Sequence, residues 1–230
     1  HCRIYANGNT KDPGYNHNLY LGGTSVTLRD CEIFGSLTGH NLKSRAHYTL
    51  VEYCFIHDSA NRECDFVEAW DTERPNSNAV LAGCIIAKRP DCPGNRGVIH
   101  FGKEKGDRNG TLYIVNTTIV TNFASAVVDL SAKAAGACFL NSVILNTTEQ
   151  NPILAGVSTG ASLANVSGKS NWMSKGYSLA GTLVDPKSRL QSADIKETLG
   201  VSAPSYRIPA QDPTWKAEPG YFFDGDGNLI

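Results

Sequence analysis

The chain has 230 residues, of which 21 are Lys or Arg and 22 are Asp or Glu, so its formal net charge is −1. This balance argues against binding of nucleic acid, which needs a broadly basic surface. No apolar stretch reaches the roughly 18 residues of a transmembrane helix, so no membrane span is expected. Gly contributes 22 residues and Asn, Thr and Ser are frequent, a composition typical of a protein rich in strands and turns.

A short pattern recurs along the chain at intervals of roughly 23 to 33 residues. Each repeat has a strand, a turn residue, a small residue and, in the central repeats, an Ile two positions later. The turn residues, called anchor positions below, are Asn7, Asp30, Tyr53, Gly83, Asn116, Asn141 and Asn165. The small residues are Cys31, Cys54, Cys84, Thr117 and Ser142, and the Ile residues are Ile33, Ile56, Ile86, Ile119 and Ile144. Each repeat is too short for a helix-containing solenoid unit and has the length of one coil of a parallel β-helix. Because side chains alternate along a strand, both columns are predicted to point inward and to stack from coil to coil.

A third strand is predicted to close each coil. These strands are expected at 18–21, 41–45, 65–70, 97–101, 126–130 and 152–156. The predicted inward column holds Leu19, Leu42, Val67, Ile99 and Val128. The predicted outward row holds Tyr20, Lys43, Glu68, His100 and Asp129, with Arg45 and Trp70 in a second outward column. The longer repeats are expected to place their extra residues in loops at 58–64, 71–78, 87–96 and 103–110.

From residue 185 onward the pattern lapses. Prolines break up this part of the chain, at Pro186, Pro204, Pro209, Pro213 and Pro219. We therefore predict a β-helix domain over 1–184 and a C-terminal tail over 185–230 that packs along it. The segment Asp224–Asn228 has the Asp and Gly spacing of a calcium loop, but the Glu at loop position 12 is absent, which favours a plain turn.

The seven cysteines are an odd number, and no Cys-x-x-Cys pair indicates a metal site. Cys64 and Cys92 are expected in polar loops at comparable places in adjacent repeats and could form a disulfide. The alternative is that all seven are reduced packing residues. The chain begins at His1 without a Met, as a mature or trimmed chain would, so a targeting segment could have been removed and further coils could precede His1.

Several segments carry a resemblance to a known group of proteins. They are Gly39–Ala46, which reads Gly-His-Asn-Leu-Lys-Ser-Arg-Ala, the flanking His17–Gly23 and Thr49–Tyr53, and the late Leu199–Val201 with Pro204–Tyr206. In these segments the chain resembles bacterial right-handed parallel β-helix proteins, a group that contains polysaccharide lyases. With the repeat, the resemblance predicts an all-β, right-handed parallel β-helix of about seven coils. It also implies a secreted, periplasmic or cell-surface location and a polysaccharide partner that contains uronate.

The resemblance suggests β-elimination as a candidate reaction. Elimination from a uronate needs a group that neutralises the carboxylate, a base that removes the C5 proton and an acid that protonates the leaving oxygen. Arg45 is the expected neutralising group, because a guanidinium can bind a carboxylate in a bidentate manner. Lys43 is the expected base, with its pKa lowered by Arg45 and by partial burial. His100 is the alternative base, or the acid.

Other residues are candidates for binding substrate or metal. Tyr20 and Trp70 offer flat faces for sugar rings, and His40, Glu68 and Lys103 complete the expected binding set. His40 also has a structural explanation, since His17 occupies the equivalent turn one coil earlier, and Lys103 belongs to a charged stretch that could simply be solvated. Glu68, Asp71 and Asp129 could instead hold Ca²⁺, which would take over the neutralising role. The alternative is that no cofactor is present.

Two other readings of the outward row remain open. Stacked charges such as Lys43 beside Glu68 are common on an exposed sheet and contribute little each. The chain could then be a non-catalytic glycan-binding or structural module of a larger surface protein or tailspike. A glycoside hydrolase, the other enzyme class considered, would need two carboxylates flanking a bond, for which Glu68, Asp71, Asp129 and Asp65 are the candidates.

Overall fold

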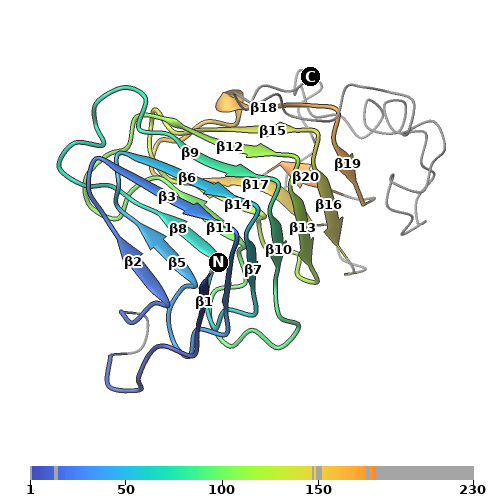
Figure 1. Cartoon of the computed structure of the whole chain (residues 1–230). Helices are drawn as coiled ribbons and strands as arrows, with labels where there is room; N and C mark the ends of the chain where they lie inside the picture. Colours follow the sequence, from blue (N-terminus) through green and yellow to red (C-terminus); the bar gives the residue numbers. More distant parts are fainter. Residues whose placement is uncertain (1, 13–14, 147, 149–151, 175–176, 180–230) are drawn as a thin grey trace.

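The computed structural model describes residues 2–12, 15–146, 148, 152–174 and 177–179. Within these residues the chain forms three sheets of parallel strands, wound into a parallel β-helix (Figure 1). Two of the sheets have seven strands and the third has six, which confirms the predicted solenoid of about seven coils. The predicted tail at 185–230, with its turn at 224–228, lies outside the described residues.

The first six coils each contribute one strand to each sheet, and the described part of the last coil contributes strands to two of them. Each sheet pairs only strands of successive coils. Sheet A contains β1 (Cys2–Tyr5), β4 (Cys31–Phe34), β7 (Phe55–His57), β10 (Ile85–Ala87), β13 (Thr118–Thr121), β16 (Val143–Asn146) and β19 (Trp172–Met173). Sheet B contains β2 (Leu19–Leu21), β5 (Leu42–Ser44), β8 (Cys64–Phe66), β11 (Ile99–Phe101), β14 (Val128–Leu130), β17 (Ile153–Val157) and β20 (Ser178–Leu179). Sheet C contains β3 (Ser25–Arg29), β6 (Tyr48–Glu52), β9 (Ala79–Ala82), β12 (Thr111–Val115), β15 (Gly136–Leu140) and β18 (Val166–Lys169).

The five central anchor positions form the sharp corner between sheets C and A. The five central anchors have positive backbone φ angles, at Asp30 (55°), Tyr53 (52°), Gly83 (63°), Asn116 (48°) and Asn141 (47°). Asn and Asp tolerate this left-handed conformation because their short polar side chains bond locally, and Gly adopts it without a steric penalty. A tight one-residue corner therefore repeats from coil to coil, as the pattern predicted.

The two terminal anchor predictions are wrong. Strand β1 pairs with β4, and Cys2 lies opposite Cys31, so this segment follows the corner and belongs to sheet A. At the other end, Asn165 lies in a short 3-10 helix, η1 (Leu163–Asn165), and the corner residue is Ser170, with a φ of 57°. Both errors arise because a lone Asn next to a short apolar segment occurs in loops as well as at corners.

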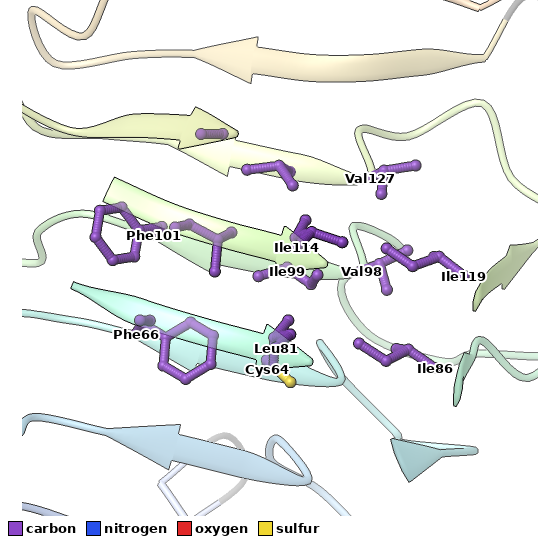
Figure 2. Packing of buried hydrophobic residues seen from close by; sticks show 14 of the residues in the cluster. Cys64, Phe66, Leu81, Ile86, Val98, Ile99, Phe101, Ile114, Ile119 and Val127 are labelled. Atoms are coloured by element: carbon purple, nitrogen blue, oxygen red, sulfur yellow. The ribbon is translucent and has the colours of Figure 1, made fainter. Parts of the chain in front are cut away.

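The inward columns form a continuous core. The predicted Ile column is fully buried, with Ile33, Ile56, Ile86, Ile119 and Ile144 all at 0% exposure. Figure 2 shows part of this core, where side chains from the three sheets meet in layers along the helix axis. Because each coil buries its apolar side chains only against its neighbours, stability accumulates coil by coil.

The structure also tests the possible disulfide between Cys64 and Cys92. Cys64 lies in strand β8, not in a polar loop, and both Cys64 and Cys92 are buried free thiols, so the possible disulfide between them is not formed. Burial raises the pKa of the Cys64 thiol well above its usual value, which keeps it protonated.

In the part of the chain that the structure describes, no helix has the length and apolar character needed to cross a membrane.

A buried polar ladder runs beneath the turn that leads into sheet B. Asn18 donates to the Asn41 side-chain oxygen at 2.7 Å, and the Asn41 amide donates to Glu63 at 2.6 Å. The Lys88 ammonium lies 3.6 Å from the Glu63 carboxylate, and both side chains are fully buried. This ladder locks four successive coils in register immediately before the strands of sheet B, which positions the residues that follow.

Candidate functional site

The outward row of sheet B brings polar residues of successive coils side by side. Tyr20 pairs with Lys43, Lys43 with Asp65, Asp65 with His100, and His100 with Asp129. The predicted row is therefore correct except on β8. Cys64 takes the inward place predicted for Val67, and Asp65 takes the outward place predicted for Glu68.

The physical reason for this correction is the alternation of burial. The three residues of β8, Cys64, Asp65 and Phe66, repeat the apolar, polar, apolar order of Ile99–Phe101. Stacking Phe66 on Phe101 fills the core, whereas a strand shifted by three residues would place different side chains in that column. Glu68 consequently lies beyond the strand end.

Asp65 is the centre of the cluster. Its carboxylate lies 2.7 Å from His100 Nδ1, 3.1 Å from Lys43 Nζ and 3.3 Å from His40 Nε2, and the residue is only 2% exposed. Burial alone would raise the pKa of the Asp65 carboxyl. The hydrogen bonds from His100 and His40 outweigh this effect and hold the pKa well below its usual value, so Asp65 is ionised.

Lys43 is a buried cation held between two carboxylates. Its ammonium bonds both to Asp65 and to Glu104, which lies on the loop after β11. Burial works to lower the pKa of Lys43, but the charges and hydrogen bonds of Asp65 and Glu104 prevail and raise it. The expectation of a lowered pKa is therefore wrong, and Lys43 is a fixed positive charge rather than a base.

Arg45 extends the cationic part of the cluster. Its guanidinium donates to the Tyr20 hydroxyl at 2.7 Å, to the Glu68 carbonyl oxygen at 2.6 Å and to the Glu104 carboxylate. Lys43 and Arg45 therefore converge on one carboxylate, that of Glu104, whose side chain is 40% exposed. Burial raises the pKa of the Glu104 carboxyl, but the two cations outweigh it and the pKa is lowered overall.

The loop after β11, residues 102–110, carries Glu104 over the row and is held by two buried charged side chains. The Glu68 carboxylate accepts hydrogen bonds from the backbone amides of Glu104, at 2.6 Å, and Lys105, at 3.0 Å. A Cβ at Gly106 would lie 2.7 Å from Glu68 Cγ, so a larger residue would push this contact apart. Glu68 thus supports the loop, and both of its carboxylate oxygens are occupied by backbone amides instead of facing the substrate or metal expected from the sequence.

Arg108 holds the far end of the same loop. This side chain is fully buried, and its guanidinium donates to four carbonyl oxygens, those of Val67, Ser77, Ala46 and His47. Burial lowers its pKa to about 10, and Arg108 remains charged at neutral pH. Because these carbonyl oxygens belong to neighbouring segments, Arg108 fixes the path of a loop that has no strand pairing to hold it.

His100 connects the cluster to a serine on the next coil. Its Nδ1 faces Asp65 at 2.7 Å and its Nε2 lies 2.6 Å from the Ser131 hydroxyl oxygen. The same hydroxyl oxygen accepts the backbone amide of Lys103 at 2.9 Å. His40 has a different environment, since its ring stacks on His17 at 4.9 Å and its backbone amide bonds to the His17 ring.

The remaining predicted site residues do not join the cluster. The Trp70 side chain lies in the turn after β8, 82% exposed, with Arg74 over its ring. Asp129 pairs with Arg62 at 3.3 Å, and Asp71 is buried in the turn that contains Trp70. Among the described residues, no three His, Cys, Asp or Glu side chains are grouped so that they could hold a metal ion, so the proposed calcium ligands are not assembled.

Comparison of the chain with protein-family models, with curated proteins and with solved structures finds no match. The site must therefore be interpreted from its own geometry.

Sequence reasoning placed Tyr20, Lys43, Arg45 and His100 near one another and missed Glu104 and Ser131. No local pattern marks those two residues, because both reach the row from segments outside the predicted strands.

Proposed function

We propose that the protein binds an acidic, uronate-containing polysaccharide across the outward row of sheet B and cleaves it by β-elimination. The observation that carries the proposal is the convergence of Lys43 and Arg45 on a single carboxylate. Two cations around one carboxylate are the arrangement needed to neutralise a uronate and to make its C5 proton acidic. Glu104 occupies in the free protein the place that we assign to the substrate carboxylate.

Charge balance supports an exchange between Glu104 and a uronate. With Glu104 in place, Lys43 and Arg45 face the carboxylates of Asp65, Glu68 and Glu104. If the carboxylate of a uronate replaces that of Glu104, the number of carboxylates that face Lys43 and Arg45 stays the same. The 40% exposure of the Glu104 side chain gives it a path outward into solvent.

We assign the proton transfer to Tyr20. Its side chain is exposed, and its oxygen accepts a hydrogen bond from Arg45. In this assignment solvent first takes the Tyr20 hydroxyl proton. The Tyr20 oxygen, held by Arg45, then removes the C5 proton and returns it to the leaving oxygen. His100 is less suited to this step because both of its ring nitrogens already face protein groups.

The carboxylates favour elimination over glycoside hydrolysis. Hydrolysis needs one carboxylic acid that stays protonated near neutral pH, which requires a raised pKa. The pKa values of Asp65, Glu68 and Glu104 are all lowered, the last two by backbone amides and by the cations respectively, against the effect of burial. None of these three carboxylates meets that requirement.

The test is the formation of an unsaturated product, which absorbs in the ultraviolet, when the purified chain is incubated with alginate, pectate or glycosaminoglycans. Arg45→Ala is expected to lower the rate about 100-fold or more, because it removes a transition-state charge contact. Arg29→Ala is the matched control, since Arg29 pairs with Glu52 on the exposed face of sheet C. Absence of ultraviolet product on all three polymers would overturn the elimination.

A non-catalytic glycan-binding module is the second candidate. The specific observation in its favour is that both cations are already neutralised by carboxylates of the protein. Such a module would bind these polymers in sedimentation or calorimetric assays and leave them intact. Binding lost in Arg45→Ala, with no product from the unaltered chain, would support this candidate over the lyase.

A further inference from the structure

Ser131, His100 and Asp65 form a continuous hydrogen-bonded chain across three coils. Ser131 follows strand β14, His100 lies on β11 and Asp65 on β8. The separations are 2.6 Å from the Ser131 hydroxyl oxygen to His100 Nε2 and 2.7 Å from His100 Nδ1 to Asp65. Both values lie within the 2.6–3.2 Å, approximately, that links nucleophile, base and orienting carboxylate in hydrolases.

The ionisation of Asp65 sets the direction of this chain. An ionised carboxylate can only accept, so His100 Nδ1 carries the proton that is donated to Asp65. His100 Nε2 then has a free electron pair and, at 2.6 Å, is a closer acceptor for the Ser131 hydroxyl proton than the Lys103 carbonyl oxygen, which lies 3.2 Å from the same hydroxyl. Asp65 thus fixes the tautomer in which His100 can act as a base toward Ser131.

The backbone around Ser131 is adapted to its hydroxyl. A Cβ at Gly102 would lie 2.3 Å from the Ser131 hydroxyl oxygen, and Gly102 has a φ of 155°, so only glycine fits there. The absence of a side chain brings the Lys103 amide within 2.9 Å of the same oxygen. This amide holds the Ser131 hydroxyl oxygen in its position beside His100.

We propose that Ser131 is the nucleophile of a second activity, the hydrolysis of small acyl esters, with His100 as its base and Asp65 as the positioning carboxylate. The expected substrate class is an O-acyl ester, such as an acetyl ester, on a polysaccharide bound along sheet B. Ser131 and His100 border the row that holds Lys43, at 6% and 7% exposure, so a small acyl group suits the site better than a bulky one. This activity does not depend on the proposed elimination.

The reaction is balanced with water as the only co-reactant. The Ser131 oxygen attacks the acyl carbonyl carbon while its proton passes to His100 Nε2. The ester bond then breaks, and the departing sugar alcohol takes that proton. Water subsequently attacks the acyl-serine and gives its proton to His100, which releases the carboxylic acid and restores Ser131.

Two probes test the proposal on the unaltered chain. A fluorophosphonate should add once per chain, and digestion with mass spectrometry should locate the adduct on Ser131. The chain should also hydrolyse p-nitrophenyl acetate, with the rate lowered about 100-fold or more in Ser131→Ala and in His100→Gln. Ser44→Ala is the matched control, because Ser44 is a buried serine of the same sheet whose hydroxyl bonds to Thr49, and its rate should equal that of the unaltered chain.

The outcomes separate this activity from the elimination. An adduct on Ser131 with loss of ester hydrolysis in both variants supports the proposal, whatever the result with uronate polymers. No adduct on the folded, unaltered chain, an adduct elsewhere, or full ester hydrolysis in Ser131→Ala overturns it. The adduct experiment needs no variant, so the proposal can be refuted even if Ser131→Ala fails to fold.

Discussion

The outer faces of sheets A and B can be compared directly, because both are rows of side chains in register on successive coils. On sheet A, the rings of Tyr5, Phe34 and His57 stack at 4.9 and 5.0 Å. Arg3 pairs with Glu32 beside them, and the Arg3 side chain is 67% exposed. Nothing in these contacts reaches beyond the neighbouring coil.

On sheet B the same construction gives a different result. Lys43 and Asp65 are neighbours in the row, but Lys43 also bonds to Glu104, from a loop 61 residues later in the chain. That loop buries the charges and commits each one to several partners. Stacking of strands alone therefore gives a row of solvent-exposed charged pairs. On sheet B a loop from another coil covers part of that row, and this is what makes it a candidate site.

The largest expected effect follows from removing the centre of the cluster. Asp65→Ala leaves Lys43 buried with one carboxylate fewer and releases His40 and His100, so we expect a loss of about 3–5 kcal/mol in the free energy of unfolding. Glu32→Ala on sheet A, where the pair is exposed, should leave stability almost unchanged. Denaturant unfolding of both variants measures this. Equal losses in the two variants would remove the distinction between the faces.

The pH dependence of stability should also differ between the two regions. Burial raises the pKa of Glu63, in the ladder below sheet B, to about 7, against an ordinary value of 4.5. A raised carboxyl pKa means that ionisation is disfavoured in the fold, so this contribution to stability is complete below pH 4.5 and is lost as the pH rises through 7. Each pKa unit corresponds to about 1.4 kcal/mol.

Asp65 acts in the opposite direction. Its lowered pKa contributes stability that is present above 3.8 and is lost as the pH falls further. Unfolding measured across pH should therefore show decreasing stability on both sides, and Glu63→Gln should remove only the decrease at higher pH. Glu32→Gln should keep the decrease at higher pH, because the Arg3 guanidinium lowers the pKa of Glu32 and this carboxyl therefore titrates only below 4.5. A Glu63→Gln profile that still declines through pH 7 would contradict this assignment.

A smaller effect is expected from loosening the loop after β11. Gly106→Ala forces a Cβ against Glu68 and should cost about 1–3 kcal/mol. It should also increase cleavage of residues 103–110 in limited proteolysis. Gly22→Ala is the control, because its Cβ would meet only Arg45 Cβ, at 4.0 Å. Equal protease resistance in the two variants would show that Glu68 does not hold the loop.

The smallest effect is expected on sheet A. Tyr5→Ala removes one ring from the end of the aromatic stack and should cost about 0.5–1.5 kcal/mol, because the side chain is already 53% exposed. Thermal unfolding would detect this shift. A loss as large as that of Asp65→Ala would mean that the aromatic row is as important to the fold as the charged cluster.

The sequence predicts the coils well because the fold is periodic. The Ile column and the positive-φ corners are set by alternation within a strand and by one-residue turns, which are local properties. The prediction of the outward row of sheet B was wrong on one strand only, β8. The alternation of apolar and polar residues at Cys64, Asp65 and Phe66 could have corrected it. A shorter strand at 64–66 matches Ile99–Phe101 residue for residue.

The cluster itself was less predictable. Glu104, Ser131 and Arg108 reach it through loops whose paths depend on buried contacts such as those of Glu68 with backbone amides. No periodicity governs those contacts. The expected lowered pKa of Lys43 was wrong because Asp65 was not placed beside Lys43 in the row and Glu104 was placed in a solvated charge run.

The position of Glu104 two coils beyond Lys43 restricts how such a chain can change in length. Adding or deleting one coil between residues 43 and 104 would move the Glu104 carboxylate by about 4.8 Å along the helix axis, beyond the reach of the Lys43 ammonium. A coil added before His17 or after Ser131 would leave every contact of the cluster in place. The solenoid could therefore gain coils at its two ends, whereas a change in the number of coils between β2 and Ser131 would separate residues of the cluster.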